Sequence, residues 1–113
     1  MIVVRPAVNA RQTVDEAEID PAEGVVGDNW RARGGWPTGP SDPAAQVTLM
    51  NARAIAAVSP DPAQWCEAGD QLFVDFDLSV DNLPAGAQVA IGEVVLRISE
   101  EPHLGCWKFS ARY

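Results

Sequence analysis

The chain has 113 residues, which suits a single domain, because single domains commonly run to about 100–150 residues. Its 16 acidic residues against 8 Lys and Arg give a net charge of −8, which argues against a nucleic-acid or anionic-lipid surface, since such surfaces bind through Lys and Arg. Hydrophobic residues at 47% and charged residues at 21% are typical of a globular protein and exclude a disordered acidic tail.

No apolar stretch approaches the roughly 18 residues of a membrane helix. The apolar start, residues 1–4, ends at Arg5 and Pro6, whereas a secretory signal begins with positive charge and continues through a longer apolar segment. Cys66 and Cys106 are too few for a disulfide scaffold and are expected to stay reduced. We therefore expect a cytoplasmic protein with no membrane partner and no nucleic-acid partner.

The first third of the chain predicts short elements separated by turns. Residues 2–4 predict a strand, and residues 15–28 predict a solvated acidic connection, because this stretch carries six carboxylates and no base. Residues 31–45, rich in Gly and Pro, predict a long loop, and loops of that length are usually functional lids or disordered.

The middle of the chain predicts a strand followed by short helices. Residues 47–50 predict the strand, and Asn51 is a good N-cap for a helix over residues 52–58. Asp61 resembles the cap of a second, very short helix, because Pro follows it at the first helical position.

The second half gives the clearest β signal. Residues 72–78 alternate apolar and polar side chains, which is typical of a strand with one buried face. Residues 88–99 predict a hairpin around Gly92, because a two-residue loop that begins with Gly fits a tight turn. We expect one core to hold Leu72, Val74, Phe76, Val89, Ile91, Val94, Leu96 and Ile98, with Asp75 and Asp77 outside it. The elements together predict a mainly β fold, a β-rich barrel with one or two short helices, as one domain over residues 1–113.

The residues best suited to chemistry gather in the segment 100–113. It holds the only histidine, His103, and the only lysine, Lys108, together with Cys106 and Arg112. A thiol becomes a useful nucleophile beside positive charge, which Lys108 and Arg112 can supply, and His103 is a candidate proton shuttle. The alternative is a packed, inert Cys106 with an incidental His103. His103 and Cys106 provide two ligands where structural zinc needs about four, so no metal site is predicted.

Cys66, the other thiol, lies beside Glu67 and near Asp70. Negative neighbours disfavour a thiolate. We therefore expect Cys106, and not Cys66, to be the reactive thiol.

Several short motifs follow one another along nearly the whole chain: residues 24–30 (GVVGDNW), 46–50 (QVTLM), 68–70 (AGD), 82–84 (NLP), Gly86, 91–92 (IG) and 102–106 (PHLGC). This ordered set resembles the MOSC domain, which is found at the C-terminus of molybdenum-cofactor sulfurases and in stand-alone bacterial proteins. The resemblance implies a barrel-like β fold with a sulfur-carrying cysteine at Cys106. Gly27 and Asp28 match the family's glycine–aspartate motif near the site.

The resemblance also implies a function and its partners. Cys106 would receive sulfane sulfur from a pyridoxal-phosphate-dependent cysteine desulfurase and deliver it to a molybdenum-cofactor acceptor. Molybdenum and pyridoxal phosphate binding are implied by the family alone. Lys108 and Arg112 would stabilise the sulfur anion and attract a phosphate. The alternative from another class is a non-catalytic module that holds a small anion or a partner protein through residues 31–45 and 103–112.

The chain departs from the family pattern at two places. Gly105 stands before Cys106 where many members have Pro, and the family usually continues beyond the position of Tyr113. We therefore expect a C-terminally incomplete domain with an unclosed barrel. An unclosed barrel exposes a strand edge, which predicts a homodimer through that edge.

Overall fold

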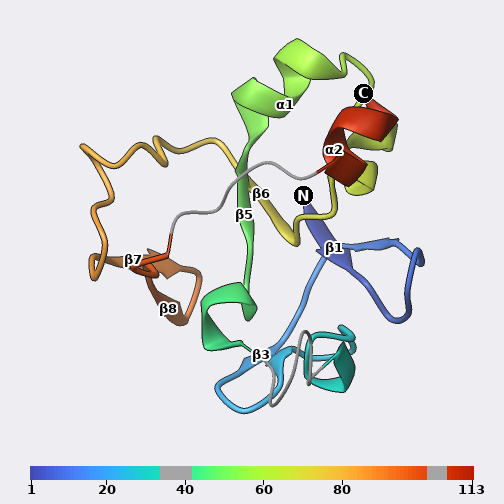
Figure 1. The fold of residues 1–113 in the computed structure, drawn as a ribbon. Helices are drawn as coiled ribbons and strands as arrows, with labels where there is room; N and C mark the ends of the chain where they lie inside the picture. The colour runs from blue at the N-terminus through green and yellow to red at the C-terminus, as the bar shows by residue number, and fades with distance from the viewer. Residues whose placement is uncertain (34–41, 102–106) are drawn as a thin grey trace.

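A computed structural model describes residues 1–33, 42–101 and 107–113 (Figure 1). Four strands make the central sheet, in the spatial order β2-β1-β6-β5. They are β1 Ile2–Val4, β2 Gln12–Val14, β5 Leu49–Asn51 and β6 Leu72–Val74. β1 runs antiparallel to β2 and to β6, whereas β5 and β6 run parallel.

The parallel pair is connected by two short helices, because parallel neighbours cannot be joined by a tight hairpin. α1, Ala52–Val58, begins at Asn51, whose side chain accepts the backbone N–H groups of the first turn. η3, a 3₁₀ helix over Pro62–Ala68, begins at Asp61, whose side chain accepts the N–H of Ala63. Both predicted caps, the predicted helix 52–58 and the predicted strand 2–4 are confirmed.

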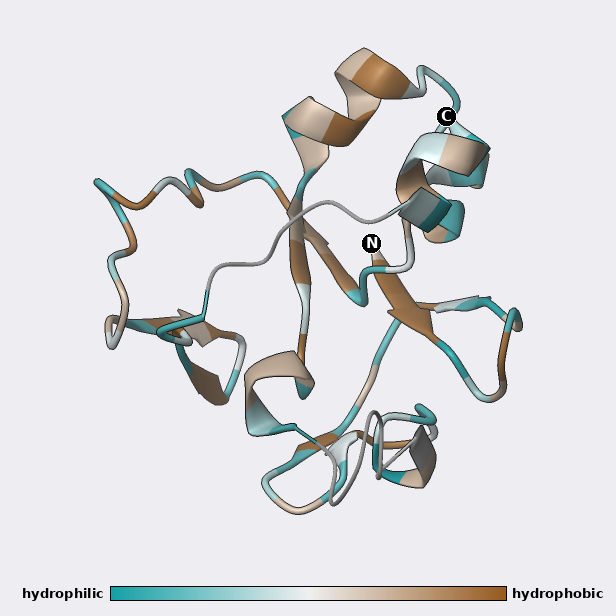
Figure 2. Cartoon of the chain, in the orientation of Figure 1, coloured by the Kyte–Doolittle hydropathy of each residue, from teal (hydrophilic) through white to brown (hydrophobic). Residues whose placement is uncertain are grey.

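The core lies between the central sheet and these helices. Val3, Ile55 and Phe73 are buried together, and Trp65 stacks on Phe73 with 6.1 Å between ring centroids. Figure 2 shows hydrophobic colour on the strands β1, β5 and β6 at the centre of the molecule and on parts of α1 above them. Phe109, from the C-terminal helix α2 (Trp107–Arg112), packs against the same cluster. The last described segment is therefore held to the sheet by apolar contact.

Two smaller sheets lie apart from the central one. β3 (Ile19–Asp20) pairs with β4 (Gly24–Val25), and β7 (Gln88–Ile91) pairs with β8 (Val94–Arg97). The predicted hairpin around Gly92, whose φ is +59°, is confirmed. In Figure 1 it lies on the left of the molecule, across the sheet from α2.

The predicted β-rich barrel is supported only in its coarser part: the strands loosely fit a mainly β class, and no closed barrel is found among the described residues. The strands are two to four residues long and divide into three sheets. β6 ends at Val74 instead of continuing to residue 78, because its parallel partner β5 ends opposite Val74 at Asn51, where α1 begins. The strand predicted over 72–78 was therefore too long.

The predicted shared core is also wrong. Leu72 and Phe73 are both buried, so β6 is covered on both faces, while Phe76 is 47% exposed beyond the strand end. The hairpin residues predicted for this core, Val89, Ile91, Val94 and Leu96, are only half-buried in their own sheet. Asp75 and Asp77 are exposed, as expected.

The acidic stretch 15–28 is more structured than predicted. It contains β3 and β4, and it ends at Asp28, whose side chain is fully buried. After it, the loop predicted over 31–45 begins and ends in single 3₁₀ turns, η1 (Arg31–Arg33) and η2 (Pro43–Ala45). The Trp30 indole N–H donates to the Asp42 carbonyl at 2.9 Å and joins the two described ends.

Within the described part of the chain, no helix has the length and apolar character needed to cross a membrane.

Candidate anion site

A pocket of about 380 Å³ lies among the β1–β2 loop, the junction between η3 and β6, and α2. Four of the chain's cationic side chains line it: Arg5, Arg11, Lys108 and Arg112. The remaining polar lining comes from Asn9, Asn29, Thr48 and Asp70. Half of the 8 Lys and Arg residues therefore surround one pocket in a chain of net charge −8.

The four cations are not equally neutralised. Arg5 is paired with Asp28 at 2.9 Å, and Arg112 lies 3.7 Å from the Glu67 carboxylate. Arg11 donates to the Ala10 carbonyl at 2.7 Å and has no carboxylate partner among the described residues. Lys108 likewise has none there, and its ammonium lies 5.9 Å from the centroid of the Trp107 ring. Against Arg11 and Lys108 the lining holds one further carboxylate, the buried Asp70, so its described residues keep a net positive charge.

Arg11 is partly buried beside other cations, and both effects disfavour its charged form. Its pKa is lowered below the usual value, first by burial and then by repulsion from Arg112 and Arg5. Its Nε atom is buried and has no hydrogen-bond partner. An anion in the pocket would relieve the repulsion between these guanidinium groups, so the electrostatics favour a negatively charged occupant.

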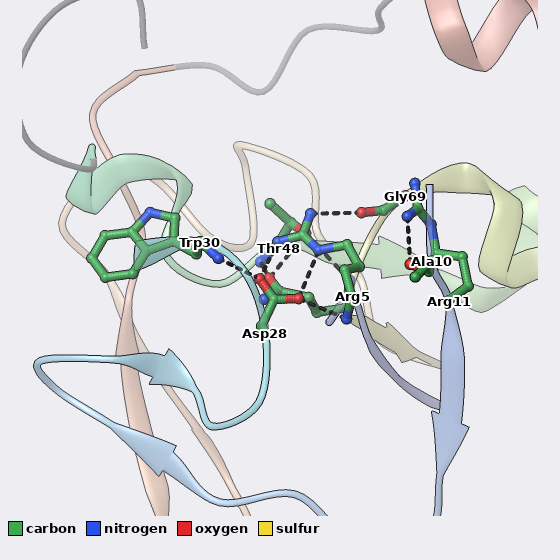
Figure 3. A network of polar contacts seen from close by, with 8 residues as sticks. Arg5, Ala10, Arg11, Asp28, Trp30, Thr48 and Gly69 are labelled. Carbon is green, nitrogen blue, oxygen red and sulfur yellow. Dashed lines mark hydrogen bonds and ion pairs between the residues drawn. The ribbon is translucent and has the colours of Figure 1, made fainter. Parts of the chain in front are cut away.

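Arg5 is a buried part of the pocket lining and is held on two sides (Figure 3). Its Nε and Nη2 donate to the two carboxylate oxygens of Asp28 at 2.9 and 3.0 Å. Its Nη1 donates to the Gly69 carbonyl at 2.8 Å. The bidentate pair ties the end of β1 to the segment after β4, and the third bond ties both to Gly69 at the end of η3.

Asp28 is saturated by donors. It accepts the backbone N–H of Arg5 at 2.9 Å and that of Trp30 at 3.0 Å, besides the guanidinium bonds. Burial alone would raise the pKa of this carboxyl, but the bonds and charge of Arg5 outweigh burial and hold the pKa below its usual value. Asp28 is therefore a fixed, ionised group.

A turn at Gly27 places Asp28 next to Arg5. The Asp28 N–H donates to the Val25 carbonyl at 2.9 Å, so residues 25–28 form a β-turn with Gly27 in its third place. Gly27 has φ +89°, the conformation that a type II turn needs there and that residues with a Cβ rarely adopt. The Gly–Asp pair consequently turns the chain and aims a carboxylate at Arg5.

The structure separates the site residues predicted from the sequence into two groups. Lys108 and Arg112 line the cationic pocket, whereas Gly27 and Asp28 line a different hollow of about 340 Å³. Arg5 connects the two groups, because it lines the first pocket and binds Asp28. The predicted catalytic residues Cys106 and His103 lie outside the described residues.

Sequence reasoning missed Arg5 and Arg11. Both flank a turn near the N-terminus, far along the chain from Lys108 and Arg112, and no local motif marks them. The only available signal was that the first third of an acidic chain places two arginines around one short turn.

The described cysteine has a structural environment. Cys66 is half-buried, packs against the core cluster, and its Sγ lies 3.6 Å from the Ala63 carbonyl. This placement is that of a packed thiol.

Among the described residues, no group of three or more His, Cys, Asp and Glu side chains is placed to hold a metal ion. Comparison with family models, with curated proteins and with solved structures gives no match.

Proposed function

We propose that the chain is a MOSC-type sulfur carrier of molybdenum-cofactor metabolism, with Cys106 as the sulfur-bearing residue. The observation that supports this most is the pocket: Lys108 and Arg112, which follow Cys106 closely in the sequence, line it together with Arg5 and Arg11. Such a pocket suits an anionic partner. The proposal places the reaction in the cytoplasm, where thiols stay reduced.

The transfer step needs only thiol chemistry. The Cys106 thiolate attacks the terminal sulfur of a persulfide on the donor, a cysteine desulfurase. A new S–S bond forms as the donor's S–S bond breaks, and the donor leaves as a thiol. Lys108 and Arg112, which follow Cys106 by two and six residues in the sequence, would favour both the attacking thiolate and the persulfide anion, and His103 would carry the proton.

The cationic pocket also fits the phosphate of the groups that the family resemblance implies. Pyridoxal phosphate carries a phosphate, and so does the molybdenum cofactor, which is here the acceptor and so a substrate. Arg11 and Lys108 would hold the phosphate, because neither has a carboxylate partner among the described residues. Pyridoxal phosphate, when bound, supplies an electron-accepting ring.

Sulfur loading tests the carrier function directly. The protein is incubated with a cysteine desulfurase and cysteine, desalted, and assayed for cyanolysable sulfur. We expect loading in the wild type and in the matched control Cys66→Ser, and none in Cys106→Ser. No loading of the wild type, or full loading of Cys106→Ser, would contradict the proposal.

A non-catalytic module that binds a small anion is the second candidate, and the same pocket favours it. The two candidates differ in their dependence on Cys106. A chain that binds sulfate with the same affinity in the wild type and in Cys106→Ser, and that never accepts sulfur from a desulfurase, is a binding module.

A further inference from the structure

We propose that Asp28 is a positioning residue for the anion pocket: it holds the Arg5 guanidinium so that the remaining N–H groups of Arg5 face the pocket, and it does not touch the ligand itself. This inference rests on the anion binding contained in the proposed function. It assigns a role to Asp28 that differs from the direct cofactor binding implied by the resemblance.

The first support is burial. The Asp28 side chain is 0% exposed, and the Arg5 side chain is 9% exposed. Arg5 belongs to the lining of the cationic pocket and Asp28 does not. A ligand in that pocket can therefore reach Arg5 and cannot reach the Asp28 carboxylate.

The second support is the use of the guanidinium donors. Of its five N–H groups, Arg5 gives two to Asp28 and one to the Gly69 carbonyl. These three bonds fix the plane of the guanidinium and leave two N–H groups, one on each terminal nitrogen. A group held this way loses little freedom when it binds an anion, so its contribution to affinity is larger than that of a mobile arginine.

The third support is that a simple charge effect and a positioning effect predict opposite changes in anion affinity when the Asp28 carboxylate is removed. A buried carboxylate next to an anion site repels the anion, so its removal should tighten binding if charge were its only influence. Positioning predicts the opposite sign, because Arg5 without Asp28 can turn away from the pocket. The sign of the change separates the two explanations.

The experiment is a sulfate titration, followed by calorimetry at pH 7 and constant ionic strength, of the wild type, Asp28→Asn and Asp75→Asn. Asp75 is the matched control, since its carboxylate pairs with Arg53 at 2.7 Å on an exposed surface away from the pocket. We expect Asp28→Asn to weaken binding about tenfold, which equals ~1.4 kcal/mol, and Asp75→Asn to leave it unchanged. Unchanged or tighter binding in Asp28→Asn overturns the inference alone, whereas no saturable binding by the wild type overturns the anion-binding function as well.

A double variant shows whether the effect acts through Arg5. In the Arg5→Gln background, Asp28→Asn should cause no further loss of sulfate affinity. A second tenfold loss in that background would mean that Asp28 acts by another route, and the inference would be wrong.

If Asp28→Asn does not fold, an NMR measurement on the wild type tests the inference instead. The side-chain Nε–H of Arg5 should give a resolved ¹⁵N signal that exchanges slowly with water before sulfate is added, because this N–H already donates to Asp28. Rapid exchange that slows only after sulfate is added would show that the ligand, and not Asp28, orders Arg5, and would contradict the inference.

Discussion

The Asp28 carboxylate accepts both the backbone N–H and the Nε–H of Arg5 at 2.9 Å, although 23 residues separate the two in the chain. One aspartate thereby fixes the main chain at the end of β1 and an arginine side chain that lines the pocket. Stability and the proposed anion binding are consequently linked through the same pair.

The first prediction concerns acid stability. The pKa of Asp28 is below its usual value of 3.8 in the folded protein, so the pair stabilises the fold above that pH and loses its contribution as the pH falls through the folded pKa. Asp28→Asn should cost about 3 kcal/mol of unfolding free energy near pH 6, because it leaves a buried guanidinium without its carboxylate. The stability of Asp28→Asn should also fall less than that of the wild type as the pH drops below 3.8, because the variant has no carboxylate at this position to protonate. Urea unfolding at each pH measures both effects.

Asp77→Asn is the control for this prediction, because the pKa of Asp77 is lowered by hydrogen bonds from Ser79 at an exposed position. An equal loss of stability near pH 6 in Asp28→Asn and Asp77→Asn would contradict the assignment of the effect to the buried pair.

The second prediction separates backbone strain from site geometry. Gly27 and Gly86 have φ values of +89° and +83°, so Ala should cost about 1–2 kcal/mol of unfolding free energy at either position. Only Gly27→Ala should also weaken sulfate binding, since the turn at Gly27 aims Asp28 at Arg5. Thermal unfolding and sulfate titration of both variants make the comparison. Equal sulfate affinity in both variants would refute the link between this turn and the pocket.

Local elements of this fold could be predicted from the sequence because their causes are local. Asn51 and Asp61 cap helices through N–H groups two or three residues away, and Gly92 supplies its own positive φ. The pairing of Arg5 with Asp28 could not be predicted, because the acidic stretch around Asp28 is indistinguishable from a solvated one until its distant partner is known.

The sequence led to a barrel and did not reveal the pocket, because both depend on contacts between segments that are far apart in the chain. The alternation in residues 72–78 does not show that the partner strand β5 ends opposite Val74, where the pairing of β6 stops. The pocket needs the β1–β2 loop beside α2, a contact between the two ends of the chain that no sequence spacing encodes.

The third prediction concerns the two thiols. Cys66 is half-buried against the core and Cys106 is the proposed sulfur carrier, so brief iodoacetamide treatment of the folded protein should label Cys106 first. Peptide mapping of the wild type, Cys66→Ser and Cys106→Ser measures the two rates separately. Faster labelling of Cys66 would contradict the assignment.

The fourth prediction is a homodimer through the β7–β8 hairpin. Within the described residues these strands pair only with each other, and Val95 is 62% exposed. The Ile98 N–H donates to the Ala87 carbonyl, so the alternation of bonded pairs leaves the N–H of Val95 pointing outward from the hairpin. Val95→Pro removes that outward donor and keeps the inner bonds.

Sedimentation should show a concentration-dependent dimer of the wild type and a monomer of Val95→Pro. Val95→Thr, which keeps the N–H, should still dimerise. A wild type that stays monomeric over a wide concentration range would contradict this prediction.

The central claim is that the cationic pocket binds an anion, and Arg11 tests it most directly because it has no carboxylate partner among the described residues. The measurement is a sulfate titration of Arg11→Gln beside Arg97→Gln, which removes the same charge from the exposed β8 strand. We predict saturable binding by the wild type and by Arg97→Gln, and a loss of about tenfold or more in Arg11→Gln. Equal binding by the two variants would contradict the claim.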